Sequence, residues 1–144
     1  MTVNREIDVL LIEDSADDAE LAARALLKRK IPHGGRVAVA RDGEEALRLL
    51  SHAPTAPKLV ILDLKMPKVG GLEVLRHVRS DARLRGVPVV VFTSSAEDAD
   101  VCASYRLGAN SYVVKPVDAG AFARVVGDVA SYWVSLNQQP HDIA

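Results

Sequence analysis

The stretch Leu59-Val60-Ile61-Leu62-Asp63 decides the fold, because an unbroken apolar run ends in a single carboxylate. A short run of this kind is typical of a strand that is buried on both faces of a parallel sheet. Open parallel sheets bind their ligands in the crevice beyond the carboxyl ends of the strands. The stretch therefore predicts a buried strand that delivers Asp63 to a functional edge of a sheet.

Strand and helix patterns alternate along the rest of the chain. Short runs rich in Val, Ile and Leu predict strands at about residues 7–12, 36–40, 58–62, 87–92 and 111–114. Apolar residues at helical spacing predict helices at residues 17–30, 43–50, 72–80 and 98–107, and a last helix from Asp118, which is a good N-cap residue. Gly108 is a good residue to end the fourth helix. This alternation predicts an α/β fold with a doubly wound, five-stranded parallel sheet.

Length and composition exclude several other classes of protein. The chain has 144 residues and a net charge of −1, which is enough for one domain and gives no basic surface for nucleic acid. No apolar run approaches the roughly 20 residues of a membrane helix, and the N-terminus lacks the pattern of a signal peptide. Cys102 is the only cysteine, which suits a reducing compartment. We therefore expect one cytoplasmic domain over residues 1–144 that binds neither membrane nor nucleic acid.

Polar residues follow three of the other predicted strands. The pair Glu13-Asp14 follows the first strand, Thr93 follows the fourth and Lys115 follows the fifth. In a parallel sheet these ends meet at one edge, so the side chains should converge with Asp63. Three carboxylates, a hydroxyl and an ammonium together suit a divalent cation and a phosphoryl group. Each residue alone could equally be a helix cap, a turn residue or a solvated surface residue.

Taken together and in order, these motifs resemble the receiver domains of two-component response regulators over nearly the whole chain. The matching pieces each stand at the end of a strand or just before one: Leu11-Ile12-Glu13-Asp14-Ser15, Leu62-Asp63-Leu64-Lys65-Met66-Pro67, Val91-Phe92-Thr93-Ser94-Ser95, Gly108-Ala109 and Tyr112-Val113-Val114-Lys115-Pro116. The resemblance implies a flavodoxin-like sheet with strand order 2-1-3-4-5. It also implies a phosphoacceptor that catalyses only its own phosphorylation and dephosphorylation, and is otherwise not an enzyme.

The resemblance assigns roles at the sheet edge. Asp63 would accept a phosphoryl group from a phosphohistidine of a sensor histidine kinase. Mg²⁺ would be held by Asp14 and Asp63, by Glu13 through water and by the backbone carbonyl of Lys65. Lys115 would place a cation, and Thr93 a hydroxyl, on the phosphoryl oxygens.

The resemblance also describes a switch. Thr93 and Tyr112 occupy the coupling positions, where the hydroxyl moves toward the phosphoryl group and the ring turns inward. This would change a surface made by the fourth helix, fifth strand and fifth helix. The family pattern further implies a cis peptide bond before Pro116.

Two positions depart from the pattern of fast receivers. Lys65 stands two residues after Asp63, and Ser95 stands two residues after Thr93. Neither residue is suited to activating a water molecule, so we expect a long-lived acyl phosphate. Both could equally be ordinary solvated loop residues.

The receiver core is expected over about residues 6–131, with an extension at 132–144. Tyr132, Trp133 and Leu136 make this extension apolar, and it resembles the ending of single-domain regulators paired with phytochrome-type histidine kinases. We therefore expect a homodimer in which these residues and Tyr112 form the interface. Since no output domain follows in the sequence, output would come from this surface. The alternative is that Trp133 and Leu136 only seal the core of their own domain.

Three other functions use similar residues or the same fold. Aspartyl-phosphate hydrolases of the haloacid dehalogenase type need an acid where this chain has Lys65, and their nucleophile follows the first strand. A flavodoxin-like cofactor binder would need a phosphate-binding loop after Ile12, which is missing. A phosphate shuttle to a histidine phosphotransferase remains open. The four histidines, His33, His52, His77 and His141, form no metal-ligand pattern.

Overall fold

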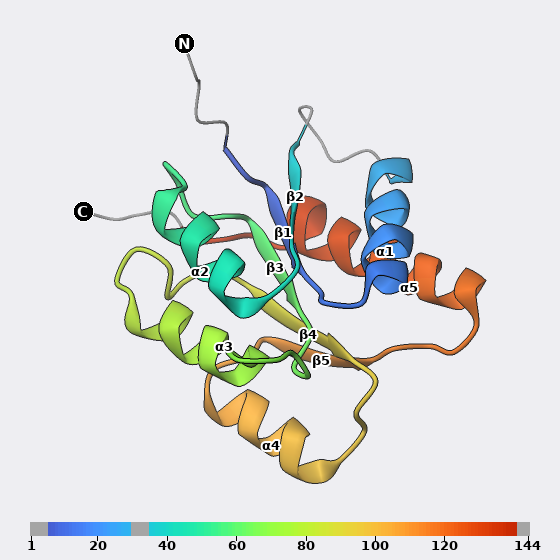
Figure 1. Ribbon diagram of the computed structural model, residues 1–144. Helices are drawn as coiled ribbons and strands as arrows, with labels where there is room; N and C mark the ends of the chain where they lie inside the picture. The colour runs from blue at the N-terminus through green and yellow to red at the C-terminus, as the bar shows by residue number, and fades with distance from the viewer. Residues whose placement is uncertain (1–5, 30–34, 141–144) are drawn as a thin grey trace.

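Five parallel strands form one sheet in the computed structural model, which describes residues 6–29 and 35–140. They occur in the order β2-β1-β3-β4-β5, as the sequence predicted (Figure 1). Their bounds are β1 (Val9–Ile12), β2 (Val37–Ala40), β3 (Leu59–Leu62), β4 (Val89–Thr93) and β5 (Ser111–Val114). In register, Leu62 pairs with Ile12 on one side and with Val91 on the other. Asp63, the residue after Leu62, therefore emerges from the carboxyl end of the middle strand.

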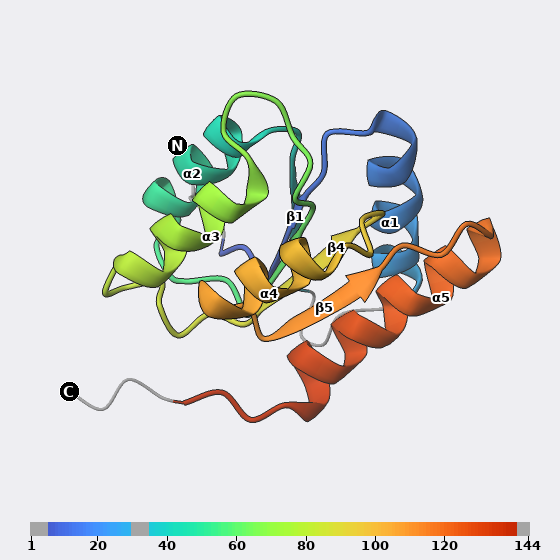
Figure 2. The same cartoon turned by 90° about the horizontal axis from the view of Figure 1, so that it is seen from below.

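Helices cover both faces of the sheet. Their bounds are α1 (Ala16–Lys28), α2 (Gly43–His52), α3 (Gly71–Ser80), α4 (Asp98–Arg106) and α5 (Ala119–Ala130). Figures 1 and 2 show α1 and α5 side by side on one face, with α2, α3 and α4 on the other. The predicted helices are all present, although the end expected for the first one at Lys30 lies outside the described residues.

The core consists of two apolar layers, one on each face of the sheet. Leu10, Ile12 and Leu62 point into the layer beneath α2 and α3, whereas Leu11 and Ile61 point into the layer beneath α1 and α5. All of these side chains are almost fully buried, since every strand except the two at the edges is covered on both faces. This burial makes β1, β3 and β4 a rigid support for the residues that follow them.

Local signals set the helix ends as expected. Asp118 caps α5 by accepting a hydrogen bond from Ala121 N at 2.8 Å, and Ser15 caps α1 in the same way through Asp18 N at 3.3 Å. Gly108 follows α4 with φ +99°, a conformation that residues with a Cβ rarely adopt.

The last helix does not end at the expected core boundary. Backbone helicity continues from Ala130 into π-helical turns over Ser131–Leu136, which Asn137 N closes by donating to Tyr132 O at 2.7 Å. The chain then reaches the residue that precedes β3, where Gln139 Nε2 donates to Lys58 O at 2.7 Å.

Candidate functional site

The acidic residues emerge side by side because the backbone ladder continues one step beyond the strands. Glu13 N donates to Ala40 O at 2.9 Å, and Asp63 N donates to Ile12 O at 3.0 Å. Carboxylate oxygens of Glu13, Asp14 and Asp63 lie within 4.8 Å of one another. Among the residues that the structure describes, this is the one group of three or more potential metal ligands. The edge predicted from the sequence is therefore assembled.

Lys115 places its ammonium among these acids. Its Nζ lies 2.7 Å from Glu13 Oε2 and 3.4 Å from Asp63 Oδ2, and its side chain is 9% exposed. The backbone aims it there, since Lys115 N donates to Thr93 O at 2.8 Å and so extends the β4–β5 ladder. Because Glu13 and Asp63 are also buried, the lysine offsets charges that water cannot reach.

This burial alters the ionisation of both partners. Desolvation raises the pKa of Glu13 to about 7, against the lowering effect of its hydrogen bond from Lys115. Burial alone would lower the pKa of Lys115, but its hydrogen bonds to Glu13 and Asp18 and the charge of Asp63 raise it instead. Lys115 therefore stays a cation at neutral pH.

The Thr93 hydroxyl has no hydrogen-bond partner. Thr93 ends β4 and is fully buried, and its Oγ1 is the one buried side-chain polar atom without a partner within residues 6–29 and 35–140. Leaving a buried hydroxyl unpaired costs about 1–3 kcal/mol. A donor kept free at this cost, in the strand next to Asp63, is consistent with a ligand that bears acceptor oxygens.

Tyr112 is hydrogen-bonded to the loop that follows Thr93. Its hydroxyl donates to Ser95 O at 2.7 Å, and burial raises the pKa of this hydroxyl. The ring packs against the apolar layer beneath α2 and α3. Thr93 directly precedes the loop that connects β4 to α4, and Tyr112 contacts this loop, so both predicted switch residues adjoin it.

The cis peptide expected before Pro116 is absent. The structure contains no cis peptide bond in its described residues, so the Lys115–Pro116 bond is trans. Lys115 reaches Glu13 and Asp63 nonetheless, because its backbone is held by Thr93 O in the sheet ladder.

Two residues contribute to the site although sequence reasoning missed them. Asp18, in the first turn of α1, forms a third ion pair with Lys115, whose Nζ lies 2.9 Å from Asp18 Oδ2. Arg41, after β2, donates from Nε to Glu13 O at 3.0 Å and from Nη2 to Asp14 O at 2.9 Å. Arg41 directly follows β2, which is the signal that could have identified it, whereas Asp18 lies on α1 and carries no such signal.

Gly71 allows α3 to start close behind the proposed acceptor. A Cβ at Gly71 would collide with the backbone carbonyl of Asp63 and with Leu64 Cα. Glycine at this position thus lets the start of α3 pack directly against the backbone of Asp63 and Leu64, where Gly71 N donates to Leu64 O at 3.1 Å.

The residues expected at a dimer interface lie on different faces of the sheet. Trp133 packs against the layer beneath α1 and α5, whereas Tyr112 contacts the opposite layer. Tyr132 is 49% exposed and Leu136 is 72% exposed, and the Tyr132 ring meets Trp133 edge-on at 5.1 Å. The half-buried Trp133 therefore packs against the core of its own domain, while Tyr132 and Leu136 face outward.

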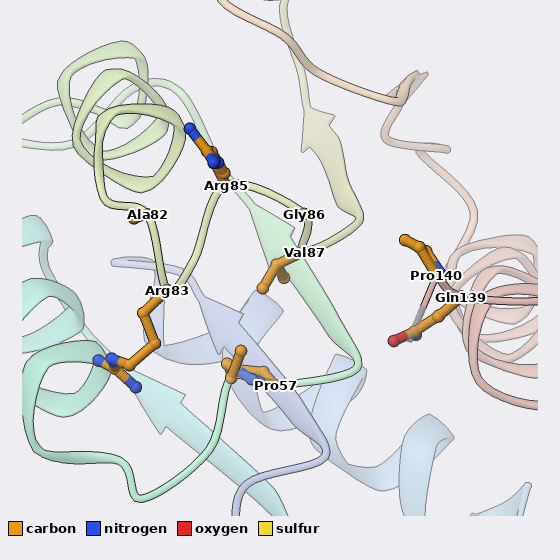
Figure 3. A pocket seen from close by; sticks show the side chains of 9 residues that line it. Pro57, Ala82, Arg83, Arg85, Gly86, Val87, Gln139 and Pro140 are labelled. Atoms are coloured by element: carbon orange, nitrogen blue, oxygen red, sulfur yellow. The ribbon is translucent and has the colours of Figure 1, made fainter. Parts of the chain in front are cut away.

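A hollow of about 320 Å³ lies at the amino ends of β3 and β4, at the opposite end of the strands from the acidic residues. Figure 3 shows it between the segment with Arg83 and Arg85 and the segment with Gln139 and Pro140. Pro57 and Val87, which precede β3 and β4, also line it. It is thus remote from the strand ends that carry the acids.

Neither described histidine joins the acidic group. His52 and His77 lie in the last turns of α2 and α3 and are not among the candidate metal ligands. His33 and His141 lie outside the described residues. No helix in the described part of the chain is long and apolar enough to cross a membrane.

The comparison with protein families agrees with this geometry. The model described as "Response regulator receiver domain" matches residues 9–126. The chain belongs to the response regulator receiver family. The probable methanogenesis regulatory protein FilR2 of Methanothrix harundinacea is 38% identical, over 92% of this chain and 86% of that protein. The response regulator Rcp1 of Synechocystis is 34% identical, over 92% of both chains.

Solved structures show the same fold and point to one subgroup. The phosphorylated cyanobacterial phytochrome response regulator RcpA superposes with a TM-score of 0.86 and 31% identity, covering 95% of this chain and 100% of that one. The Mn²⁺-bound form of Rcp1 superposes with a TM-score of 0.84 and 32% identity, with the same coverage. This receiver is therefore similar over nearly its full length to phytochrome-associated response regulators.

Proposed function

We propose that this receiver accepts a phosphoryl group on Asp63 from a sensor histidine kinase. The observation that carries the proposal is the juxtaposition of Asp63 with Lys115 at 3.4 Å, beside the buried Glu13 and the half-buried Asp14. An Asp63 oxygen attacks the phosphorus of a phosphohistidine, the P–N bond breaks, and the imidazole nitrogen keeps the electron pair and takes up a proton. Lys115 and Thr93 supply the cation and the hydroxyl donor for the phosphoryl oxygens.

The donor set fits Mg²⁺. Three carboxylates within 4.8 Å are hard oxygen ligands of the kind that this ion prefers, and one Lys cannot neutralise all of them. Glu13, Asp14 and Asp63, with the Lys65 carbonyl, would hold the ion. When bound, it would offset the negative charge that gathers as two anions approach each other. The Mn²⁺ form of Rcp1 supports a divalent cation in this family.

Thr93 and Tyr112 would carry the signal outward. Thr93 offers an unpartnered hydroxyl in the core, and Tyr112 contacts the loop that starts one residue later. A phosphoryl oxygen that accepts from Thr93 Oγ1 would move this loop and release the Tyr112 ring from Ser95 O. The affected surface is α4, β5 and α5, as expected for a receiver switch.

We further propose that the partner kinase is of the phytochrome type and that the regulator forms a homodimer. The likeness to RcpA and Rcp1 supports the first point, since RcpA is described as a phytochrome response regulator. The exposed side chains of Tyr132 and Leu136 next to α5 support the second. A two-fold contact would bury this apolar pair against the same pair of a second copy.

Phosphorylation with a small donor tests the proposed acceptor. Incubation with Mg²⁺ and acetyl phosphate should add one phosphoryl group, stable in acid and labile in base, to the wild-type protein. Asp63→Asn should remain unmodified, whereas Asp8→Asn, at the opposite edge of the sheet, should be labelled like the wild type. Full labelling of Asp63→Asn would place the acceptor at another residue.

A further inference from the structure

The first turn of α4 is attached to the rest of the protein mainly by polar contacts. Within α4, all of which the structure describes, only Ser104 is buried. The N-cap residue Glu97 makes no side-chain capping hydrogen bond. Helices with so few buried apolar contacts open at low free-energy cost. The position of this turn therefore depends on the few side chains that anchor it.

Asp100 is the principal anchor. Its Oδ2 lies 3.2 Å from Lys65 Nζ and also accepts a hydrogen bond from Ser95 Oγ. The hydrogen bond from Ser95 lowers the pKa of Asp100 most, and the contact with Lys65 lowers it further. The Asp100 side chain is 17% exposed. One carboxylate thus joins the β3–α3 loop, the β4–α4 loop and the first turn of α4.

Lys65 lies between two possible anionic partners, the Asp100 carboxylate and a phosphoryl group on Asp63. It lies two residues after Asp63, and its backbone N–H donates to Asp63 Oδ1 at 3.4 Å. Its side chain is 62% exposed, so the ammonium can move without disturbing the core. A phosphoryl group on Asp63 would carry more negative charge than the Asp100 carboxylate, and would offer several acceptor oxygens.

We infer that Lys65 and Asp100 form a latch that holds the first turn of α4 until Asp63 is phosphorylated. The inference rests on the proposed function, because the trigger is the phosphoryl group. Lys65 leaves Asp100 for the phosphoryl oxygens, and the first turn of α4 loses one anchor. Ser95 contacts both the latch and the predicted switch residue, since its hydroxyl donates to Asp100 and its carbonyl accepts from Tyr112. The latch therefore reaches the same loop as Thr93 and Tyr112 through different residues.

Hydrogen exchange on the unphosphorylated protein tests the latch by itself. Lys65→Met and Asp100→Asn should each speed amide exchange at residues 97–103 by roughly two- to fivefold, as expected for the loss of a partly exposed ion pair. Lys58→Met is the matched control, because Lys58 pairs with Asp8 at 3.4 Å at the far edge of the sheet with similar exposure. It should leave α4 unchanged. Unaltered exchange in both latch variants would overturn the inference.

The release step is tested with beryllofluoride and Mg²⁺, which mimic the phosphoryl group. In the wild type the mimic should raise the melting temperature and speed exchange at residues 97–103. In Lys65→Met, where the latch is already open, saturating mimic should raise the melting temperature less and add no further change in exchange at these residues. Binding of the mimic to the wild type without any effect at these residues would overturn the latch alone. No binding at all would overturn the proposed function and, with it, the release step.

Discussion

Lys115 Nζ lies 2.7 Å from Glu13 Oε2, closer than it lies to Asp63, whose Oδ2 is 3.4 Å away. Without a divalent ion, the lysine is thus the main neutralising group for a buried glutamate. The proposed phosphorylation needs the same ammonium at Asp63. Metal, proton and phosphoryl group should therefore influence one another through this pair, and this coupling can be measured.

Stability of the metal-free protein should fall as pH rises through the titration of Glu13. The pKa of Glu13 is about 7 in the folded protein and 4.5 for an ordinary glutamate. The folded state therefore binds this proton more tightly than the unfolded state, and protonation of Glu13 stabilises the fold. This contribution is complete below about pH 4.5 and is lost as pH approaches and passes 7. Thermal unfolding in chelator should show Glu13→Gln gaining about 5 °C over the wild type between pH 5 and 7.5. A difference that does not change with pH would contradict the assigned shift.

Mg²⁺ should stabilise the protein through Asp14. Clustered carboxylates repel one another, and an ion that binds only the folded state adds about 2.7 kcal/mol at a hundredfold excess over its Kd. The melting temperature should therefore rise with Mg²⁺ in the wild type and in the control Asp8→Ala, but not in Asp14→Ala. An unchanged Mg²⁺ response of Asp14→Ala would show that the ion binds elsewhere.

Thr93→Val should separate stability from function. Valine has nearly the same shape and removes the unpaired buried hydroxyl, so the free energy of unfolding should rise by about 1 kcal/mol. The same change removes the donor proposed for the phosphoryl group, so stabilisation by beryllofluoride should weaken. Thr93→Ser, which keeps the hydroxyl, should retain the response to the mimic. Loss of stability in Thr93→Val would mean that the hydroxyl has a partner in solution.

Much of the site could be predicted from the sequence because parallel strands present their carboxyl ends at one edge. Asp63 and Glu13 follow strands directly, so strand order alone brings them together. Asp18 and Asp100 could not be predicted in their roles, because they lie on helices whose rotation depends on packing. The trans bond at Pro116 could not be predicted either, since both isomers of an X-Pro bond are close in energy.

The extension shows the same limit of sequence reasoning. Trp133 and Leu136 are both apolar and stand three residues apart, yet one packs on the core and the other is exposed. The π-helical turns decide which side chain faces inward, and no simple apolar period reports such turns.

Loss of phosphate should be slow and should depend on Lys65. On phosphorylation Lys65 would move from Asp100 to the phosphoryl oxygens, where its ammonium has no lone pair to accept a hydrogen bond from water, and Ser95 donates its hydroxyl to Asp100. Neither side chain is therefore arranged to orient a water molecule for attack. Lys65→Asn supplies a neutral amide at this position and should speed hydrolysis of the acyl phosphate several-fold. The decay of labelled protein, measured after removal of the donor, checks this. A slower decay in Lys65→Asn would show that the lysine itself assists hydrolysis.

The proposed homodimer should depend on Tyr132 and Leu136 and not on Trp133. Their side chains are 49% and 72% exposed, so Tyr132→Asp and Leu136→Asp should leave the melting temperature nearly unchanged while shifting sedimentation velocity profiles from dimer to monomer. Trp133→Ala should instead cost about 2 kcal/mol of stability, because this side chain packs against the layer beneath α1 and α5.

Point substitutions are preferable to removing residues 132–144, since truncation would also remove Trp133 from the core. The profiles should be recorded at tens of micromolar protein with and without beryllofluoride. A wild-type protein that stays monomeric in both states would contradict the dimer, and a dimer that survives both aspartate substitutions would place the interface elsewhere.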